Sequence, residues 1–517
     1  MYQAVVMLSV PKQQITRNIV INCTPQAIKQ ELKDLPIQDM PYTLRQTCAL
    51  LALINRTQIN DNKRLGIMQC FDYAFRNLDE HYHLRNPQAL LHSTNKEKDK
   101  LAELKQEMAY GYKTILLEAI ARNDLTHKPI AEIIYMAMYY LGHSIMQCYD
   151  NYTLPNNDLW YEINQLYSFA ERYQVHRVTI GRAFSLPAAN TIEDYFKQIL
   201  LVELANPYQL SPSESWQVYS YLGHWVKHVK LLNEPQYLNH SEYFLLDLDS
   251  QRCPHQIFAP PQPDQHSFRY LTPDRLIALI EQHINTLRGG HRPAEIGIPN
   301  SNNNKRAIEL LMVIERQWQH LKHRQGLRLP CDSFTAVAWG VDTIHEILIP
   351  SDNLPIQTSG QHRATGKMVN ESPGGYCLKI NQALMSEFYN GQIIAMRSDK
   401  QSHPRWLLGF VRWQQQLPQT GSSLVGIQYL KGHVRPVTLH PIQKLSKKQT
   451  LAGLMLTNQE NDGKQQHSLL ASAGSLALGR ELKLVVPQKQ KGYEIQTNHL
   501  LNHTPLVEQY SFKAFAA

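Results

Sequence analysis

The sequence lacks long apolar runs, paired cysteines and the common metal and nucleotide-hydrolysis motifs. No stretch holds the roughly 18 uninterrupted apolar residues of a membrane helix, and the start has no basic segment followed by an apolar one. The seven cysteines are scattered, with no C-x-x-C pair, which favours reduced thiols over disulfides or a zinc site. We therefore expect a cytoplasmic protein, with recruitment to a membrane-associated machine left open.

Motifs for metal or phosphate chemistry are also missing. The histidines, including His81 and His83, do not have the spacing of a known metal site. Gly289-Gly290-His291 is not followed by the lysine and the serine or threonine of a phosphate-binding loop. We therefore expect neither a resident metal ion nor a cofactor.

What the chain does have is the composition of a folded, multidomain protein. Apolar residues make up 43% and charged residues 19%, far from the composition of a disordered chain. At 517 residues it exceeds the size at which single cores stop growing, so we expect two to four domains. Of the net charge of +8, a large part falls in residues 431–517, with 11 Lys and Arg against 5 Asp and Glu. A basic terminal domain suits an anionic partner or is simply a solvated surface.

Apolar spacing divides the first part of the chain into four segments. Residues 42–232 have helical spacing, and residues 233–303 are typical of a small α/β unit that ends in an amphipathic helix. A linker helix is expected over 304–323. Residues 1–41 form an N-terminal extension in which AVVMLSV and NIVINCT are predicted as strands that pair with YFLLDLD. The clearest helical face comprises Ile130, Ile133, Ile134, Ala137, Met138 and Leu141.

Beyond residue 324 the pattern changes to short β-rich runs separated by turn residues. FTAVAW, YCLKI, QIIAMRS, RWLLGFVRW and SLVGIQYL are predicted as strands of a barrel over 324–430. LAGLMLT, SLLAS, ELKLVV, GYEIQT and LVEQYSF continue similarly and predict a small C-terminal β domain over 431–517. The fold class is therefore multidomain α+β.

Two motifs at the start of the predicted barrel carry the functional signal. Arg324 and Arg328 form an R-x-x-x-R pair, and NESPGG supplies Asn370, Ser372 and Gly375 in the pattern Asp/Asn-x-Ser-x-x-Gly. Either motif alone is weak, because charged helix ends and Asn-Ser-Pro-Gly turns are common. The two motifs in this order are much rarer than either motif alone.

Together with the later runs Val411-Arg412-Trp413 and Val425 to Leu430, this order resembles the PilZ domain, a bacterial family that binds cyclic di-GMP. The resemblance covers residues 324–430 and implies a ligand site without catalysis. It implies a second-messenger receptor in which Arg324, Arg328, Asn370, Ser372 and Gly375 hold the ligand. It also implies coupling to a protein partner, here through the helical region, with pilus function, motility or surface attachment as outputs. No enzyme activity is expected, because acidic metal-binding motifs for turnover of the messenger are absent.

The chemistry of these residue types fits the ligand. Guanine O6 and N7 match the guanidinium fork, which also stacks on purines. Asn370 offers an amide donor and acceptor, Ser372 a hydroxyl, and Gly375 a backbone that a ligand can approach closely.

Three alternatives remain open at this stage. Asn370 follows Arg328 by 42 positions, which suggests an inserted loop or, alternatively, that Arg363 and Lys367 imitate the first motif. The basic tail and small barrels also suit a nucleic-acid-binding protein, although nucleic acid is not the partner we expect. A helical scaffold whose barrel has lost its ligand is the third possibility.

Overall fold

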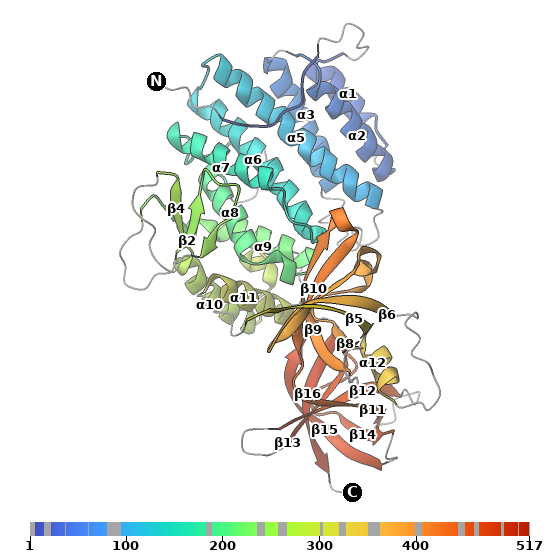
Figure 1. Cartoon of the computed structure of the whole chain (residues 1–517). Helices are drawn as coiled ribbons and strands as arrows, with labels where there is room; N and C mark the ends of the chain where they lie inside the picture. The colour runs from blue at the N-terminus through green and yellow to red at the C-terminus, as the bar shows by residue number, and fades with distance from the viewer. Residues whose placement is uncertain are drawn as a thin grey trace. The chain divides into compact units, whose positions relative to one another are not determined.

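The computed structural model divides the chain into two compact units, Met1–Leu321 and Lys322–Ala517. Figure 1 shows helices in the first unit and barrels in the second. Among the described residues, no helix is both long and apolar enough to cross a bilayer. The structure describes residues 6–14, 22–36, 38–59, 61–79, 95–181, 189–234, 243–256, 266–299, 303–319, 327–349, 362–398, 406–442, 450–459, 465–487, 491–504 and 506–515.

The first unit is built mainly from amphipathic helices. The predicted face from Ile130 to Leu141 is buried in α6, and polar residues cap several helix starts. Ser211 and Glu214, for example, form a capping box at the start of α9. The helices are α1 Pro25–Lys33, α2 Met40–Asn55, α3 Asp61–Asp79, α5 Asn95–Ala121, α6 His127–Asp150, α7 Asn157–Arg172, α8 Ile192–Leu204, α9 Pro212–Trp225, α10 Asp274–Arg288 and α11 Asn304–Trp318, with 3-10 turns η3 Pro207–Gln209, η4 Val226–His228 and η5 Pro293–Ile296.

The described parts of the two N-terminal segments that were predicted as strands contain no strand. Residues 6–10 and 22–24, the described parts of AVVMLSV and NIVINCT, lie outside strands. Their apolar residues serve another purpose, because Val6 and Leu8 pack along the helices and Ser9 donates two hydrogen bonds to Glu162. Short apolar runs do not distinguish a strand from such an extended segment.

The small sheet instead pairs within its own region. Its order is β1-β4-β2-β3, so YFLLDLD pairs with later strands. The sheet and α10 share one hydrophobic core with the helical region, and so does α11, which was predicted as a linker. Trp318 of α11 is buried and donates to the Leu201 carbonyl at 3.2 Å. The strands are β1 Lys230–Leu232, β2 Phe244–Asp247, β3 His255–Gln256 and β4 Phe268–Thr272.

A buried carboxylate lies between three of these helices. Asp72 of α3 accepts hydrogen bonds from the hydroxyls of Tyr112 and Tyr140, each at 2.5 Å. Burial raises the pKa of Asp72 to about 6, and the two tyrosine hydroxyls only partly oppose this rise. The charged form of Asp72 therefore destabilises the folded unit.

We expect Asp72→Asn to alter how stability depends on pH. The pKa of Asp72 is higher in the folded than in the unfolded protein, so the natural chain loses stability as pH rises from about 4 to about 6, by up to about 3 kcal/mol. The asparagine variant lacks this loss, and its advantage over the natural chain should grow over the same interval. Urea unfolding of both proteins across this pH range measures the difference. A difference that does not change with pH would contradict the assignment.

The second unit contains two closed antiparallel barrels, which confirms the predicted fold class. All the strands predicted beyond residue 324 are present. The first barrel contains β5 Leu329–Trp339, β6 Arg363–Ser372, β7 Gly375–Asn381, β8 Ile393–Ser398, β9 Leu407–Leu417 and β10 Ser422–Tyr429, with 3-10 turns η6 Gln382–Glu387 and η7 Pro418–Thr420; the second contains β11 His433–Pro441, β12 Leu451–Gln459, β13 Gln465–Ser472, β14 Glu481–Val486, β15 Lys491–His503 and β16 Val507–Phe515.

The two barrels have the same strand connections. In each, the first strand pairs with the second and fourth, the third pairs with the second and sixth, and the fifth pairs with the fourth and sixth. The C-terminal domain therefore repeats the topology of the first barrel, which its sequence does not reveal.

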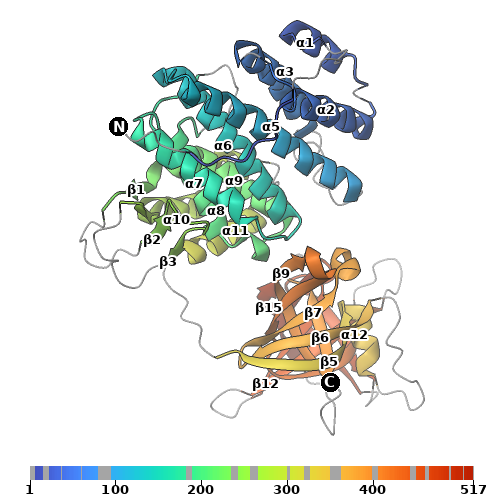
Figure 2. The same ribbon diagram turned by 45° about the horizontal axis from the view of Figure 1, so that its top comes forward.

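A short helix, α12 Val341–Leu348, follows β5 and helps to join the barrels. It begins after Gly340, whose φ of +85° favours glycine. Figure 2 shows α12 beside β5. Val341 and Ile344 are buried in a core to which both barrels contribute. That core also includes Ile393, Ala395, Leu408 and Phe410 from the first barrel and Leu454, Leu456, Leu470 and Val507 from the second.

Candidate ligand site on the first barrel

The pairing of β5 with β6 brings the two sequence motifs together. Leu329 lies opposite Glu371, and Pro330 lies opposite Asn370. Continuing this antiparallel register by one residue places Arg328 beside Ser372. Arg328 and Asn370 are 42 positions apart in the sequence, but the pairing of the strands brings them close together in space.

The extra length between the motifs lies at the other end of these strands. It contains α12, together with residues 350–361, which lie outside the described residues. The sequence assigns the excess to the polar stretch 351–367, whose described end, from Arg363 to Lys367, belongs to β6. Arg324, the first arginine of the pair, also lies outside the described part of the chain.

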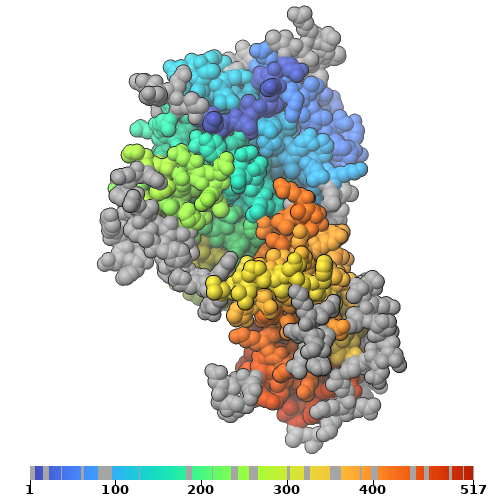
Figure 3. Space-filling model, viewed as in Figure 1, coloured from blue at the N-terminus to red at the C-terminus, as the bar shows by residue number. Residues whose placement is uncertain are grey.

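Arg328 is exposed on the outer surface of the barrel. Burial raises the pKa of the Cys377 thiol to about 11, and the positive charge of Arg328 opposes this rise. Cys377 is the β7 partner of Asn370. The positive charge of Arg328 therefore lies near Asn370 and Cys377, and we call these three residues the proposed ligand patch. Figure 3 shows the β5 region, in yellow, on the surface.

Ser372 and Gly375 hold the hairpin between β6 and β7. The Ser372 hydroxyl donates to the Gly375 carbonyl at 3.1 Å, across the two-residue turn Pro373-Gly374. The backbone N–H of Tyr429 donates to the Gly374 carbonyl at 3.0 Å. The turn is therefore fixed both by its own serine and by the end of β10.

In the structure, position 375 requires glycine for a reason different from the one expected from the sequence. A Cβ at this position would lie 2.0 Å from the carbonyl oxygen of Ile427. The close approach is thus to the neighbouring strand β10, whatever ligand binds. Glycine here permits the barrel to close.

We expect Gly375→Ala to destabilise the first barrel by about 1–3 kcal/mol, because neither backbone can move away easily. Gly374→Ala is the matched control, since a Cβ at Gly374 would meet nothing within 4 Å. Denaturant unfolding of the two variants measures the difference. Equal stability would show that β7 and β10 tolerate the side chain.

A strip formed by Cys377 and Gly426 separates Arg328 from an aromatic ring on the same outer face. Cys377 pairs with Gly426, and Gly426 pairs with Trp413 of β9. A Cβ on Gly426 would lie 1.9 Å from the indole Nε1 of Trp413, so the ring lies against this glycine. The sequence predicted the strand containing Trp413, but not that its ring would border this strip.

The alternative arginine does not belong to this patch. Arg363 begins β6 opposite Ala338 and pairs with Glu346 of α12 at 3.3 Å. Seven residues of strand put its Cα roughly 23 Å from that of Asn370. The geometry therefore favours Arg328 over Arg363 as the partner of the second motif.

Comparison with known proteins identifies the family of the chain. Residues 26–236 match the model described as "Cyclic-di-GMP receptor FimW, N-terminal domain", and residues 355–436 match "Cyclic-di-GMP receptor FimW, middle PilZ domain". The chain belongs to the PilZ-domain family of cyclic-di-GMP receptors. The curated protein "Cyclic-di-GMP receptor FimW" of Pseudomonas aeruginosa is 20% identical over 508 residues, which cover 82% of this chain and 80% of that protein.

The first match also covers most of the helical unit, to which the sequence motifs assigned no family. Within the PilZ barrel, the middle-domain match begins after β5, so it includes Asn370, Ser372 and Gly375 but not Arg328. The assignment of Arg328 therefore rests on the strand register alone.

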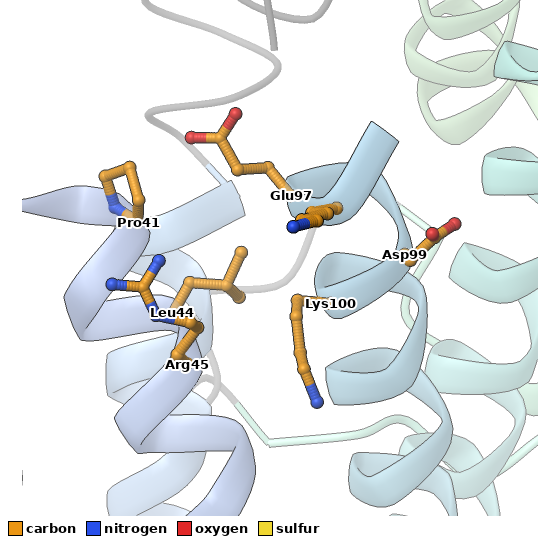
Figure 4. A pocket seen from close by; sticks show the side chains of 7 residues that line it. Pro41, Leu44, Arg45, Glu97, Asp99 and Lys100 are labelled. Atoms are coloured by element: carbon orange, nitrogen blue, oxygen red, sulfur yellow. The ribbon is translucent and has the colours of Figure 1, made fainter. Parts of the chain in front are cut away.

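Other candidate sites have weaker support. A hollow of about 520 Å³ lies between α2 and the start of α5 (Figure 4). Its lining mixes Arg45 and Lys96 with Glu97 and Asp99, and Lys100 is paired with Glu103 at 2.5 Å. Within the described ranges, no cluster of three or more His, Cys, Asp or Glu side chains is arranged to hold a metal ion.

Proposed function

We propose that this protein binds cyclic di-GMP on the outer face of the PilZ barrel. Arg328, Asn370 and Ser372 are the proposed ligand-binding residues, Arg324 completes the arginine pair, and Gly375 shapes the hairpin. The observation that supports this best is the opposition of Pro330 and Asn370 across β5 and β6. It joins two motifs whose separation in sequence had argued against a common site.

The side chains suit the two chemical features of the messenger. A guanidinium fork binds the O6 and N7 acceptors of guanine or a phosphodiester. The indole of Trp413 provides an aromatic face, on which a base stacks without sequence preference. The Ser372 hydroxyl already donates to the turn and can still accept a hydrogen bond.

Calorimetric titration of the full chain with cyclic di-GMP tests the proposal. We expect saturable binding that excess GTP does not displace. Titration with single-stranded RNA or DNA tests the nucleic-acid alternative, for which binding should be tight and fall steeply with salt. Absence of binding to cyclic di-GMP, with tight binding to nucleic acid, would replace the receptor function by that alternative.

We propose that the helical unit delivers the output to a protein partner, in pilus function, motility or surface attachment. Support comes from the N-terminal match, which joins this unit to the PilZ barrel in one kind of receptor. Arg328 lies close in sequence to the division between the units at residues 321 and 322, so ligand capture there would be transmitted to the helical unit and signal occupancy. Crosslinking in cells should then enrich a partner that depends on the messenger. Enrichment that is unchanged in Arg328→Ala would contradict this coupling.

A further inference from the structure

Two lysines lie directly opposite each other on the wall of the PilZ barrel. Lys367 of β6 pairs with Lys379 of β7. Both side chains face outward, because the alternating neighbours Met368, Leu378 and Ile380 fill the barrel core. Like charges directly opposite in a sheet are destabilising, so the arrangement has a cost that the fold does not require.

Only one of the two lysines forms an ion pair with a carboxylate in the described part of the chain. The ammonium of Lys367 pairs with Asp332 of β5 at 2.9 Å. Lys379 is half-buried, and its partner on the other side is the apolar Leu424. No ion pair of Lys379 is found among the described residues. Its charge is therefore available to an anion.

Lys379 lies within reach of the proposed ligand patch. Lys379 is the next outward-facing residue of β7 after Cys377, two positions further along the strand. Cys377 pairs with Asn370 and is close enough to Arg328 for the positive charge to lower its pKa. Two residues of strand separate the Cα atoms of Lys379 and Cys377 by roughly 6.6 Å, about the reach of an extended lysine side chain. An anion held by Arg328 and Asn370 would thus be close enough for the Lys379 ammonium to contact it.

We propose that Lys379 is an additional phosphate-binding residue of the cyclic di-GMP site. The inference rests on the proposed function and extends the site along β7, away from the hairpin. Lysine acts on phosphate as a point charge, while the arginine forks orient the ligand. A bound phosphodiester also relieves the repulsion between Lys379 and Lys367, so binding offsets a cost present in the free protein.

Calorimetric titration of Lys379→Gln with cyclic di-GMP tests this proposal, with Lys483→Gln as the control. Lys483 is exposed on β14 of the second barrel, so both variants lose one positive charge. We expect affinity to fall about tenfold in Lys379→Gln and to stay within about twofold of the natural chain in Lys483→Gln. The loss should shrink at high salt, which screens the charge.

A stability measurement separates a binding role from a structural one. Removing the opposed charge should raise the urea midpoint of Lys379→Gln, although its affinity is lower. If the variant binds as tightly as the natural chain, or loses stability together with affinity, Lys379 is not a ligand-binding residue. If the natural chain itself fails to bind, the receptor function fails and not this extension of it.

Discussion

Arg328→Ala is expected to weaken cyclic di-GMP binding roughly five- to a hundredfold, because a bidentate arginine contact contributes about 1–3 kcal/mol. The side chain is exposed and makes no packing contact that the barrel core needs. The variant should therefore unfold at the same denaturant concentration as the natural chain. Titration calorimetry measures the affinity and urea unfolding the stability.

Arg363→Ala is the matched control for this loss. It removes the same side chain from the same barrel wall, but at the far end of β6, where Arg363 pairs with Glu346. Its affinity for the messenger should be unchanged. If Arg363→Ala weakened binding and Arg328→Ala did not, the register argument for the site would be wrong.

Ile344→Ala should have the largest effect on stability, about 2–5 kcal/mol. Ile344 of α12 is 0% exposed and lies in the core shared by both barrels, so its truncation leaves a cavity that two packed walls cannot easily fill. Urea unfolding followed by tryptophan fluorescence measures the loss.

Ile442→Ala makes the same chemical change on the surface, because Ile442 is 43% exposed. It should change stability by no more than about 0.5 kcal/mol. Equal effects of the two substitutions would mean that α12 does not fasten the barrels together.

Elements with strong apolar periodicity were predictable from the sequence, and elements without it were not. The α6 face and the strands that were predicted in both barrels have regular patterns. In contrast, β6 contains Gly366, Lys367 and Asn370, and it contributes only the buried Met368 and the partly buried Ala364 to the barrel core. Its strand state is set by pairing with β5 and β7, which local sequence does not encode. The short helix α12 was missed for a similar reason, since eight residues give too few turns to establish a period.

The candidate site was predictable in its residue types but not in its arrangement. The motifs identified Asn370, Ser372 and Arg328, whereas only the register could choose between Arg328 and Arg363. The role of Gly375 depends on a strand 52 positions later, at Ile427. Such contacts between distant segments follow from barrel closure, and spacing within one motif does not reveal them.

The opposition of Lys367 and Lys379 was hidden for the same reason. Each lysine alone is an ordinary exposed strand residue, and only the pairing of β6 with β7 makes them neighbours. The repeated topology of the second barrel also emerges only from strand pairing.

Hydrogen exchange of the full chain with and without saturating cyclic di-GMP tests the central claim most directly. The account predicts slower amide exchange in residues 370–377, at the β6–β7 hairpin, at Leu329, which begins β5, and at Arg328 just before it. Exchange in the second barrel, 433–515, should change little. Unchanged exchange at 370–377 with the ligand bound, or protection confined to the second barrel, would contradict the site.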